Sequence, residues 1–174
     1  TGRVDDVINV AGHRLSTAEM EEVVAAHKDV AECCVVGIDD ELKGQVPFAI
    51  AVLKSGSKAN QEELEQDIVA LVREKIGAVA CLKNAMVVNR LPKTRSGKIL
   101  RKLIRTMLDG KEYQMPSTID DESIVEELQE MMNVYKRDKI EKAYLSSFCV
   151  VSIVSINSSL IEVSFSILFK ILSN

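Results

Sequence analysis

Two nearly continuous apolar runs constrain the fold of this chain more than any other feature. VAECCVVGI covers residues 30–38 and VPFAIAVL covers residues 46–53, and the polar segment DDELKGQ separates them. A strand with one solvated face alternates apolar and polar residues, whereas unbroken runs are typical of strands covered on both faces. We therefore expect two buried strands that pair as neighbours.

Helical patterns surround these strands. Ser16 or Thr17 is placed to cap a helix that ends near His27, with Glu19 and Glu21 in the first turns, where the helix dipole favours negative charge. A second helix ends at Gly77, and its apolar face consists of Leu64, Ile68, Leu71, Val72 and Ile76. The run AMVVN (85–89) predicts a third strand, ILRKLIRTML (99–108) a further helix, and residues 120–136 a last helix.

This order of elements predicts an α+β fold, in which a small three-stranded sheet packs against two or three helices. Residues 1–15 precede it and predict a tight hairpin around Ala11-Gly12-His13. The apolar stretches of this hairpin are short, and an exposed charged turn leads into it. We interpret it as a connection that contributes nothing to the core.

The composition changes after about residue 143. From there to the end, Glu162 and Lys170 are the charged side chains, and residues 143–161 are uncharged. That stretch is nearly long enough to span a bilayer, but Ser and Asn are frequent and no basic flank or aromatic belt frames it, so a membrane anchor is disfavoured. A buried strand pair has no better support. We interpret residues 138–174 as a divergent apolar tail on an otherwise complete domain.

The charge balance argues against a nucleic-acid partner. Lys and Arg number 22 against 26 Asp and Glu, whereas binding to phosphates needs a basic face. The four cysteines form no CxxC pair, and the adjacent Cys33 and Cys34 cannot comfortably bridge each other. We expect reduced core cysteines and an intracellular protein. Because the chain begins Thr-Gly-Arg without an initiator Met or a targeting segment, we also expect it to come from a longer protein.

Leu91-Pro92-Lys93-Thr94-Arg95-Ser96-Gly97-Lys98 concentrates three cations in an acidic chain. We interpret the segment as a flexible turn that presents amines to an anion. It is not a Walker A loop, because Ile99 stands where that loop has its metal-binding Ser or Thr, and no glycine stands five residues before Gly97. From composition alone, a solvated basic turn without a ligand is the more ordinary interpretation.

A second cluster lies near the N-terminus, in Gly2-Arg3-Val4-Asp5-Asp6 and Gly12-His13-Arg14. Arginine can hold a phosphate or carboxylate with two parallel hydrogen bonds. A surface network of ion pairs would use the same residues, so neither cluster decides the function by itself.

Taken together, the two clusters resemble one family, the adenylate-forming acyl-CoA synthetases. Its C-terminal domain opens with a GRxDDxI…GxR pattern and later carries PKTRSGK, and both patterns are intact here. The resemblance covers residues 1 to about 136 and includes GRVDDVINVAGHRLSTAEMEE, KGQVPFA, LVREKIGAVA and LPKTRSGKILR. It is nearest the branch that activates acetate or propionate, and DGKEYQMPSTIDDESI leans towards propionate.

The resemblance implies a reaction in two steps, in which a carboxylate and ATP form an acyl-adenylate and coenzyme A then takes the acyl group. Lys98 matches the lysine that enters the active site for adenylation, where an ammonium offsets charge gathered in the transition state. Asp5 matches the hinge about which the domain turns between the steps. Arg3 and Arg14 match contacts to the nucleotide. Each of these residues could instead be an ordinary surface charge.

The resemblance also implies a binding site for coenzyme A. Ala11 and Gly12 match the turn that lines the pantetheine tunnel, where a missing side chain leaves room, and Arg73 matches an arginine that binds a CoA phosphate. His27 aligns with a helix end that supplies oxygen ligands to a metal in some relatives, with Ala25 and Val30 beside it. An ordinary helix-terminal histidine is the better interpretation, so we assign no metal to this chain, and His13 is likewise interpreted as structural.

We therefore expect a hinge and hairpin at residues 1–15, an AMP-binding C-terminal domain at 16–137 and the tail at 138–174. ATP, CoA and Mg²⁺ would act in the full-length enzyme, whose N-terminal ATP-binding domain is the expected partner, together with a small carboxylic acid. The chain alone should be inactive, because the groups that position ATP and acid are missing. The alternative is a non-catalytic module that binds CoA, a nucleotide or another protein. A mitochondrial matrix location is expected if the source is eukaryotic, and a cytoplasmic one otherwise.

Overall fold

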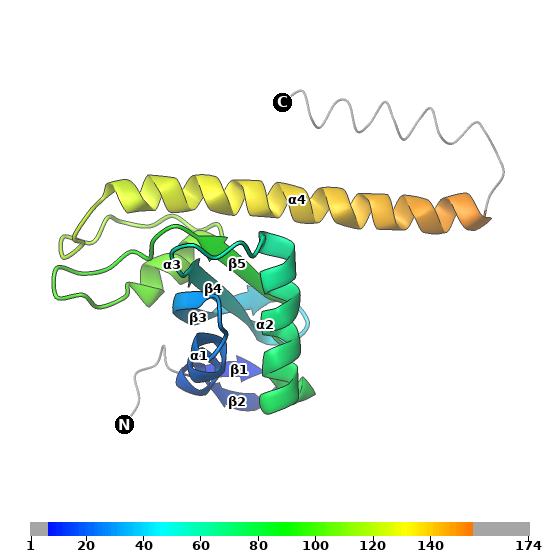
Figure 1. Ribbon diagram of the computed structural model, residues 1–174, viewed down its shortest axis with the longest axis horizontal. Coiled ribbons are helices and arrows are strands. Elements are labelled where there is room, and N and C mark those ends of the chain that lie inside the picture. Colours follow the sequence, from blue (N-terminus) through cyan, green and yellow to red (C-terminus); the bar gives the residue numbers. More distant parts are fainter. Residues whose placement is uncertain (1–6, 155–174) are drawn as a thin grey trace. The chain divides into compact units, whose positions relative to one another are not determined.

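The computed structural model describes residues 7–154, with side chains to residue 146. Strands and helices are interspersed in it. They are β1 (Val7–Val10), β2 (His13–Ser16), α1 (Thr17–Ala25), β3 (Val30–Asp40), β4 (Gly44–Leu53), α2 (Gln61–Lys75), the 3₁₀ turn η2 (Ala78–Ala80), β5 (Asn84–Val88), α3 (Arg101–Leu108) and α4 (Ser123–Val154). The α+β class expected from the sequence is confirmed (Figure 1).

The sheet is built on β4. β3 pairs with it antiparallel from Val30↔Leu53 to Asp40↔Gly44, which confirms that the two apolar runs are neighbours. β5 pairs with β4 in parallel. The β1–β2 hairpin joins the start of β4 through Val10↔Gly44, so the sheet has five strands, three central ones and the hairpin.

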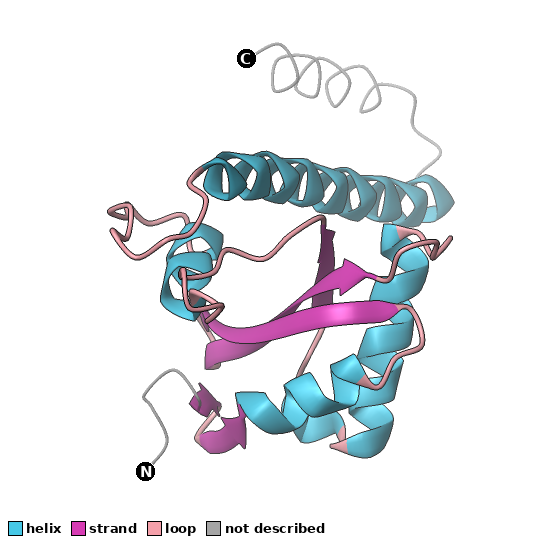
Figure 2. Ribbon diagram, turned by 60° about the vertical axis from the view of Figure 1, so that its left-hand side comes forward, coloured by secondary structure: helices cyan, strands magenta, loops and turns pink. Residues whose placement is uncertain are grey.

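Helices cover both faces of the central strands. Residues of α1 and α2 share one core cluster with Val35, Ala49 and Ala85 of the sheet. Because successive strand residues point to opposite faces, Val36, Ile50 and other buried neighbours face the other way. On that side α3 and the first turns of α4 supply buried side chains, namely Leu103, Ile104, Met107, Ile124, Val125, Leu128 and Met132. Figure 2 shows the sheet between α1 on one side and α3 on the other.

The N-terminal hairpin is part of the core, so its interpretation as a mere connection is wrong. Ile8 and Val10 are 1% and 2% exposed and belong to the main core cluster. Gly37 of β3 makes this packing possible, because a Cβ atom there would lie 3.1 Å from the Cγ2 atom of Ile8. The short apolar stretches of the hairpin did not indicate its role in the core, because burial of its side chains depends on which part of the protein the hairpin packs against.

Ser16 caps helix α1, as one of the two expected residues, and its hydroxyl accepts a hydrogen bond from the Glu19 N–H at 3.4 Å. Helix α4 begins at Ser123, inside the predicted range 120–136, and continues beyond it to Val154, into the segment where the composition changes. The chain divides into two units between Asn133 and Val134. No helix in the described part of the chain has the length and apolar character needed to cross a bilayer.

Candidate functional site

The basic segment before α3 forms a small hairpin. Thr94 N–H donates to the Lys98 carbonyl at 2.8 Å, and Gly97 N–H donates back to the Thr94 carbonyl at 2.8 Å. Lys93 and Ile99 face each other in an antiparallel bridge. Gly97 has φ +79°, a left-handed conformation that glycine adopts without steric cost. Lys98 therefore sits where the tight turn returns towards α3.

A third segment holds this hairpin from the other side. Arg95 N–H donates to the Thr118 carbonyl at 3.1 Å, and Asp120 N–H donates to the Lys93 carbonyl at 2.9 Å. Together with the Thr94↔Ile119 bridge, these bonds make a miniature three-stranded arrangement. The expectation of a flexible turn is wrong in this respect, because a segment about twenty residues further along the chain pairs with the turn's backbone. We call residues 93–99 the Lys98 hairpin.

The three cations of the Lys98 hairpin have different surroundings. Lys93 forms an ion pair with Glu32 of β3, with Nζ 2.7 Å from Oε1. Arg95 and Lys98 are exposed. The Lys98 N–H donates to Thr94 Oγ1 at 3.1 Å, so its backbone is fixed while its side chain faces solvent. Lys98 can therefore meet an anion brought to this surface.

Ion pairs fix helix α3 to α1 at its start and to β3 at its end. At its start, Arg101 Nη2 lies 2.7 Å from Glu21 Oε2 of α1. At its end, Arg105 pairs with Asp39 of β3 at 3.2 Å, and Lys111 pairs with the same carboxylate. Hydrogen bonds from Lys111 and Arg105 lower the pKa of the Asp39 carboxyl. The start of α3, which follows the Lys98 hairpin, is thus tied to α1.

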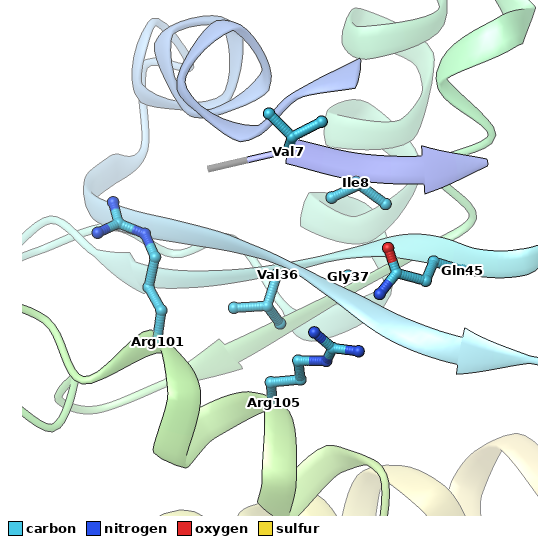
Figure 3. Close-up of a pocket in the computed structure, with 7 residues that line it drawn as sticks. All are labelled: Val7, Ile8, Val36, Gly37, Gln45, Arg101 and Arg105. Atoms are coloured by element: carbon cyan, nitrogen blue, oxygen red, sulfur yellow. The ribbon is translucent and has the colours of Figure 1, made fainter. Parts of the chain in front are cut away.

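Arg101 and Arg105 also line a small cavity between α3, β1 and β3 (Figure 3). Its volume is about 120 Å³, and its other walls include Ile8, Gly37 and Gln45. Gln45 Oε1 accepts the Asn9 N–H at 3.0 Å and so ties β1 to β4. Both arginines already pair with carboxylates, Arg101 with Glu21 and Arg105 with Asp39. We therefore interpret the cavity as a gap in the packing at the edge of the core and not as a ligand site.

The residues predicted to bind coenzyme A lie near one another. Ala11 and Gly12 are exposed and form the β1–β2 turn, with φ of +47° and +86°. Ala11 N–H donates to the Lys43 carbonyl at 2.9 Å. Lys43 lines a groove of about 330 Å³ that Arg73 also lines. Lys43 therefore links the turn to the groove.

This groove carries more positive charge than the sequence indicated. Lys43, Arg73 and Lys83 line it together with the small residues of η2, and Lys43 Nζ donates to Cys81 Sγ at 3.3 Å. Lys43 and Lys83 were not identified from the sequence. They come from the β3–β4 turn and from the segment before β5, so no local motif joins them to Arg73.

The other predicted residues have separate positions. Arg14 and His13 are exposed on β2, while Arg3 and Asp5 lie outside the described residues. His27 is largely buried; its Nδ1 accepts the Asp29 N–H at 3.3 Å and its Nε2 lies 3.5 Å from Asp67. Among the side chains of the described residues, no group of three His, Cys, Asp or Glu could hold a metal ion.

Comparisons with known proteins match this chain to one family. Residues 19–98 match the family model described as AMP-binding enzyme C-terminal domain. This chain carries that domain. An uncharacterized protein of Pseudomonas aeruginosa is 58% identical over 135 residues, which are 78% of this chain and 22% of the relative. The mitochondrial acyl-CoA synthetase short-chain family member B of Dictyostelium discoideum is 50% identical over 134 residues, 77% of this chain and 20% of the relative.

A solved structure shows the same fold for the domain. The crystal structure of Brucella canis acyl-CoA synthetase superposes with a TM-score of 0.55 at 34% identity, over 60% of this chain and 19% of that protein. The chain thus spans about a fifth of the length of the relatives it matches. The part that matches is the C-terminal domain of these relatives.

Proposed function

We propose that this chain is the C-terminal lid of a short-chain acyl-CoA synthetase. The complete enzyme would join acetate or propionate to ATP, in the presence of Mg²⁺, and then transfer the acyl group to coenzyme A. The identity to a short-chain synthetase over 77% of the chain supports this reaction class. The groups that position ATP and the acid would lie on an N-terminal domain, so the isolated chain would have no ligase activity.

Lys98 would act in the first step. The observation that carries this proposal is its exposed side chain on a backbone held by hydrogen bonds at Thr94. Negative charge collects on the carboxylate and the α-phosphate oxygens as they approach, and an ammonium placed between them lowers the energy of that arrangement. A lysine can reach in and withdraw on a flexible stem, as a lid requires.

The second step would use the other end of the domain. Ala11 and Gly12 would let the pantetheine arm pass, and Arg73 would bind a phosphate of coenzyme A. The cationic groove supports this assignment, because Lys43 lies on it and is bonded through its backbone to Ala11. Arg73→Ala should accordingly raise the KM for CoA without changing adenylation.

Rotation of the lid would exchange these two surfaces at one active site. Asp5 would be the hinge, because a few loop residues can absorb the dihedral change of a domain rotation. Arg3 and Arg14 would contact the nucleotide. Arg14 is exposed on β2, which suits such a contact.

The role of Lys98 can be tested in a chimera. Residues 1–137 would replace the matching C-terminal part of the Dictyostelium relative, and the two half-reactions would be measured separately. Lys98→Ala should slow adenylation by about 10²- to 10³-fold, as expected for the loss of one group that stabilises transition-state charge. The adenylation rate is measured by the exchange of pyrophosphate into ATP. Formation of the thioester from supplied acyl-adenylate should be nearly unchanged.

Lys102→Ala is the matched control, because Lys102 is also exposed, lies one helical turn further along the chain and carries the same charge. It should leave both half-reactions intact. Equal losses in both half-reactions for Lys98→Ala, or none in either, would contradict the assignment.

A further inference from the structure

Two ion pairs bracket the Lys98 hairpin. On its incoming strand, Lys93 Nζ lies 2.7 Å from Glu32 Oε1. Directly after its outgoing strand, Arg101 Nη2 lies 2.7 Å from Glu21 Oε2. Both carboxylates belong to the α1–β3 part of the domain, so the hairpin is tied at each end to elements far away in the sequence.

The Arg101–Glu21 pair is a well-supported one. Arg101 donates to Glu21 Oε1 through Nε at 3.2 Å and through Nη2 at 3.0 Å, in addition to the bond to Oε2. The Val35 N–H also donates to Glu21 Oε1 at 2.9 Å, which fixes the carboxylate relative to β3. The side chains are 27% and 17% exposed, and a charge-assisted pair at this depth is stronger than a solvated one.

The Lys93–Glu32 pair lies beside an irregularity of β3. The pairing register of β3 and β4 shifts between Val30 and Glu32, so a β-bulge or a similar irregularity precedes the glutamate. Bulges often re-aim a side chain next to a functional site. Here Glu32 meets Lys93 with about a third of each side chain exposed.

The two ion pairs also give the nearby cations different roles. Lys93, Arg95, Lys98, Arg101 and Lys102 lie within ten positions, and their mutual repulsion opposes an ordered hairpin. Glu32 and Glu21 neutralise the first and the fourth of them. The anchoring cations are thereby kept from competing for an incoming anion, whereas the Lys98 side chain remains exposed.

We propose that Glu21 and Glu32 are positioning residues for adenylation, which hold the Lys98 hairpin in register so that the Lys98 amine reaches the reacting oxygens. This inference rests on the proposed function of Lys98. A displacement of about 1 Å in a catalytic group can cost about 10²-fold in rate, so a loosened clamp should be visible in kinetics. The effect should fall on the first half-reaction, because the second does not use Lys98.

The test uses the chimera with Glu32→Gln and Glu21→Gln. Each change keeps the shape and an acceptor oxygen, including the acceptor for the Val35 N–H, but removes the charge. Each should slow adenylation about tenfold and leave thioester formation from supplied acyl-adenylate within twofold. Asp39→Asn is the matched control, because it removes the same charge from an ion pair at the far end of α3 and should leave both steps unchanged.

A charge reversal provides the rescue. Glu32→Lys alone would set two ammonium groups against each other and should slow adenylation further, whereas Glu32→Lys with Lys93→Glu should recover most of the rate. Failure of the double variant to exceed the single one would overturn the positioning role of this pair.

The two proposals fail in different ways. If Lys98→Ala abolishes adenylation while both glutamine variants keep the full rate, the positioning inference is wrong and the function of Lys98 stands. If Lys98→Ala keeps adenylation, both are wrong. Hydrogen exchange on the 174-residue chain gives a readout independent of activity: Glu32→Gln should speed exchange at the Gly97 and Thr94 amides but not at β3 amides, and unchanged rates would count against the clamp.

Discussion

Gln61, the first residue of α2, closes the outer edge of β5 with its side-chain amide. Its Nε2 donates to the Ala85 carbonyl at 2.6 Å, and its Oε1 accepts the Val87 N–H at 2.6 Å. The amide thus takes the place of a further strand. Since Glu65 Oε1 also accepts the Ala85 N–H at 3.0 Å, helix α2 satisfies three backbone groups of β5.

Gln61→Leu should remove two of these bonds without changing the size of the side chain. It leaves the Ala85 carbonyl and the Val87 N–H unpaired at a half-buried edge, and each such group costs about 1–3 kcal/mol. Water reaches part of this edge, so we take the lower half of that range for each of the two groups and expect a loss of about 2–4 kcal/mol in the free energy of unfolding. Helix propensity does not contribute, because Leu and Gln are nearly equal.

The loss can be measured by unfolding the 174-residue chain in urea, with circular dichroism as the probe. Gln66→Leu is the control: Gln66 lies on the same helix but is exposed, so its replacement should change stability by less than about 0.5 kcal/mol. Equal stabilities for the two variants would refute the account of Gln61, since they would mean that water replaces both bonds at no cost.

Two further predictions concern the core. Ile8→Ala should cost about 2–4 kcal/mol in urea unfolding, because Ile8 is 1% exposed, whereas Leu42→Ala at 94% exposure should cost almost nothing; a small loss for Ile8 would mean that the hairpin is a connection after all. Burial, assisted by the negative charge of Glu21, raises the pKa of the Cys34 thiol to about 12 from the unfolded value of 9.0. The unfolded thiol therefore ionises first, so its contribution to stability is complete below pH 9 and disappears as the pH rises towards 12. Cys34→Ala should flatten the fall in stability between pH 9 and 11, and an unchanged slope would contradict this reasoning.

Much of the fold followed from local patterns. The unbroken apolar runs at 30–38 and 46–53 predicted the central pair β3 and β4, and the spacing from Leu64 to Ile76 predicted α2. The hairpin was expected in the right place but with the wrong role, because the burial of Ile8 depends on a glycine 29 positions away. Helix α4 was expected to be shorter, because the apolar, Ser-rich composition after residue 143 concealed its continuation.

For the candidate site, too, the sequence predicted one part and the structure added another. The motif around Lys98 made this residue the catalytic candidate, and the exposure of its side chain agrees with an accessible amine. The motif did not show the third segment at 118–120 that orders the hairpin, nor the cations Lys43 and Lys83 beside Arg73.

The amino-acid sequence alone determined the order of strands and helices, the family and the position of the basic segment, because these depend on spacing between near neighbours. The tertiary structure alone decided which charges meet. Glu21 and Arg101 are 80 positions apart, and neither has a local signature that names the other. Long-range pairing depends on how packed elements approach one another, and that approach determines which cations around Lys98 are held by carboxylates and which stay exposed.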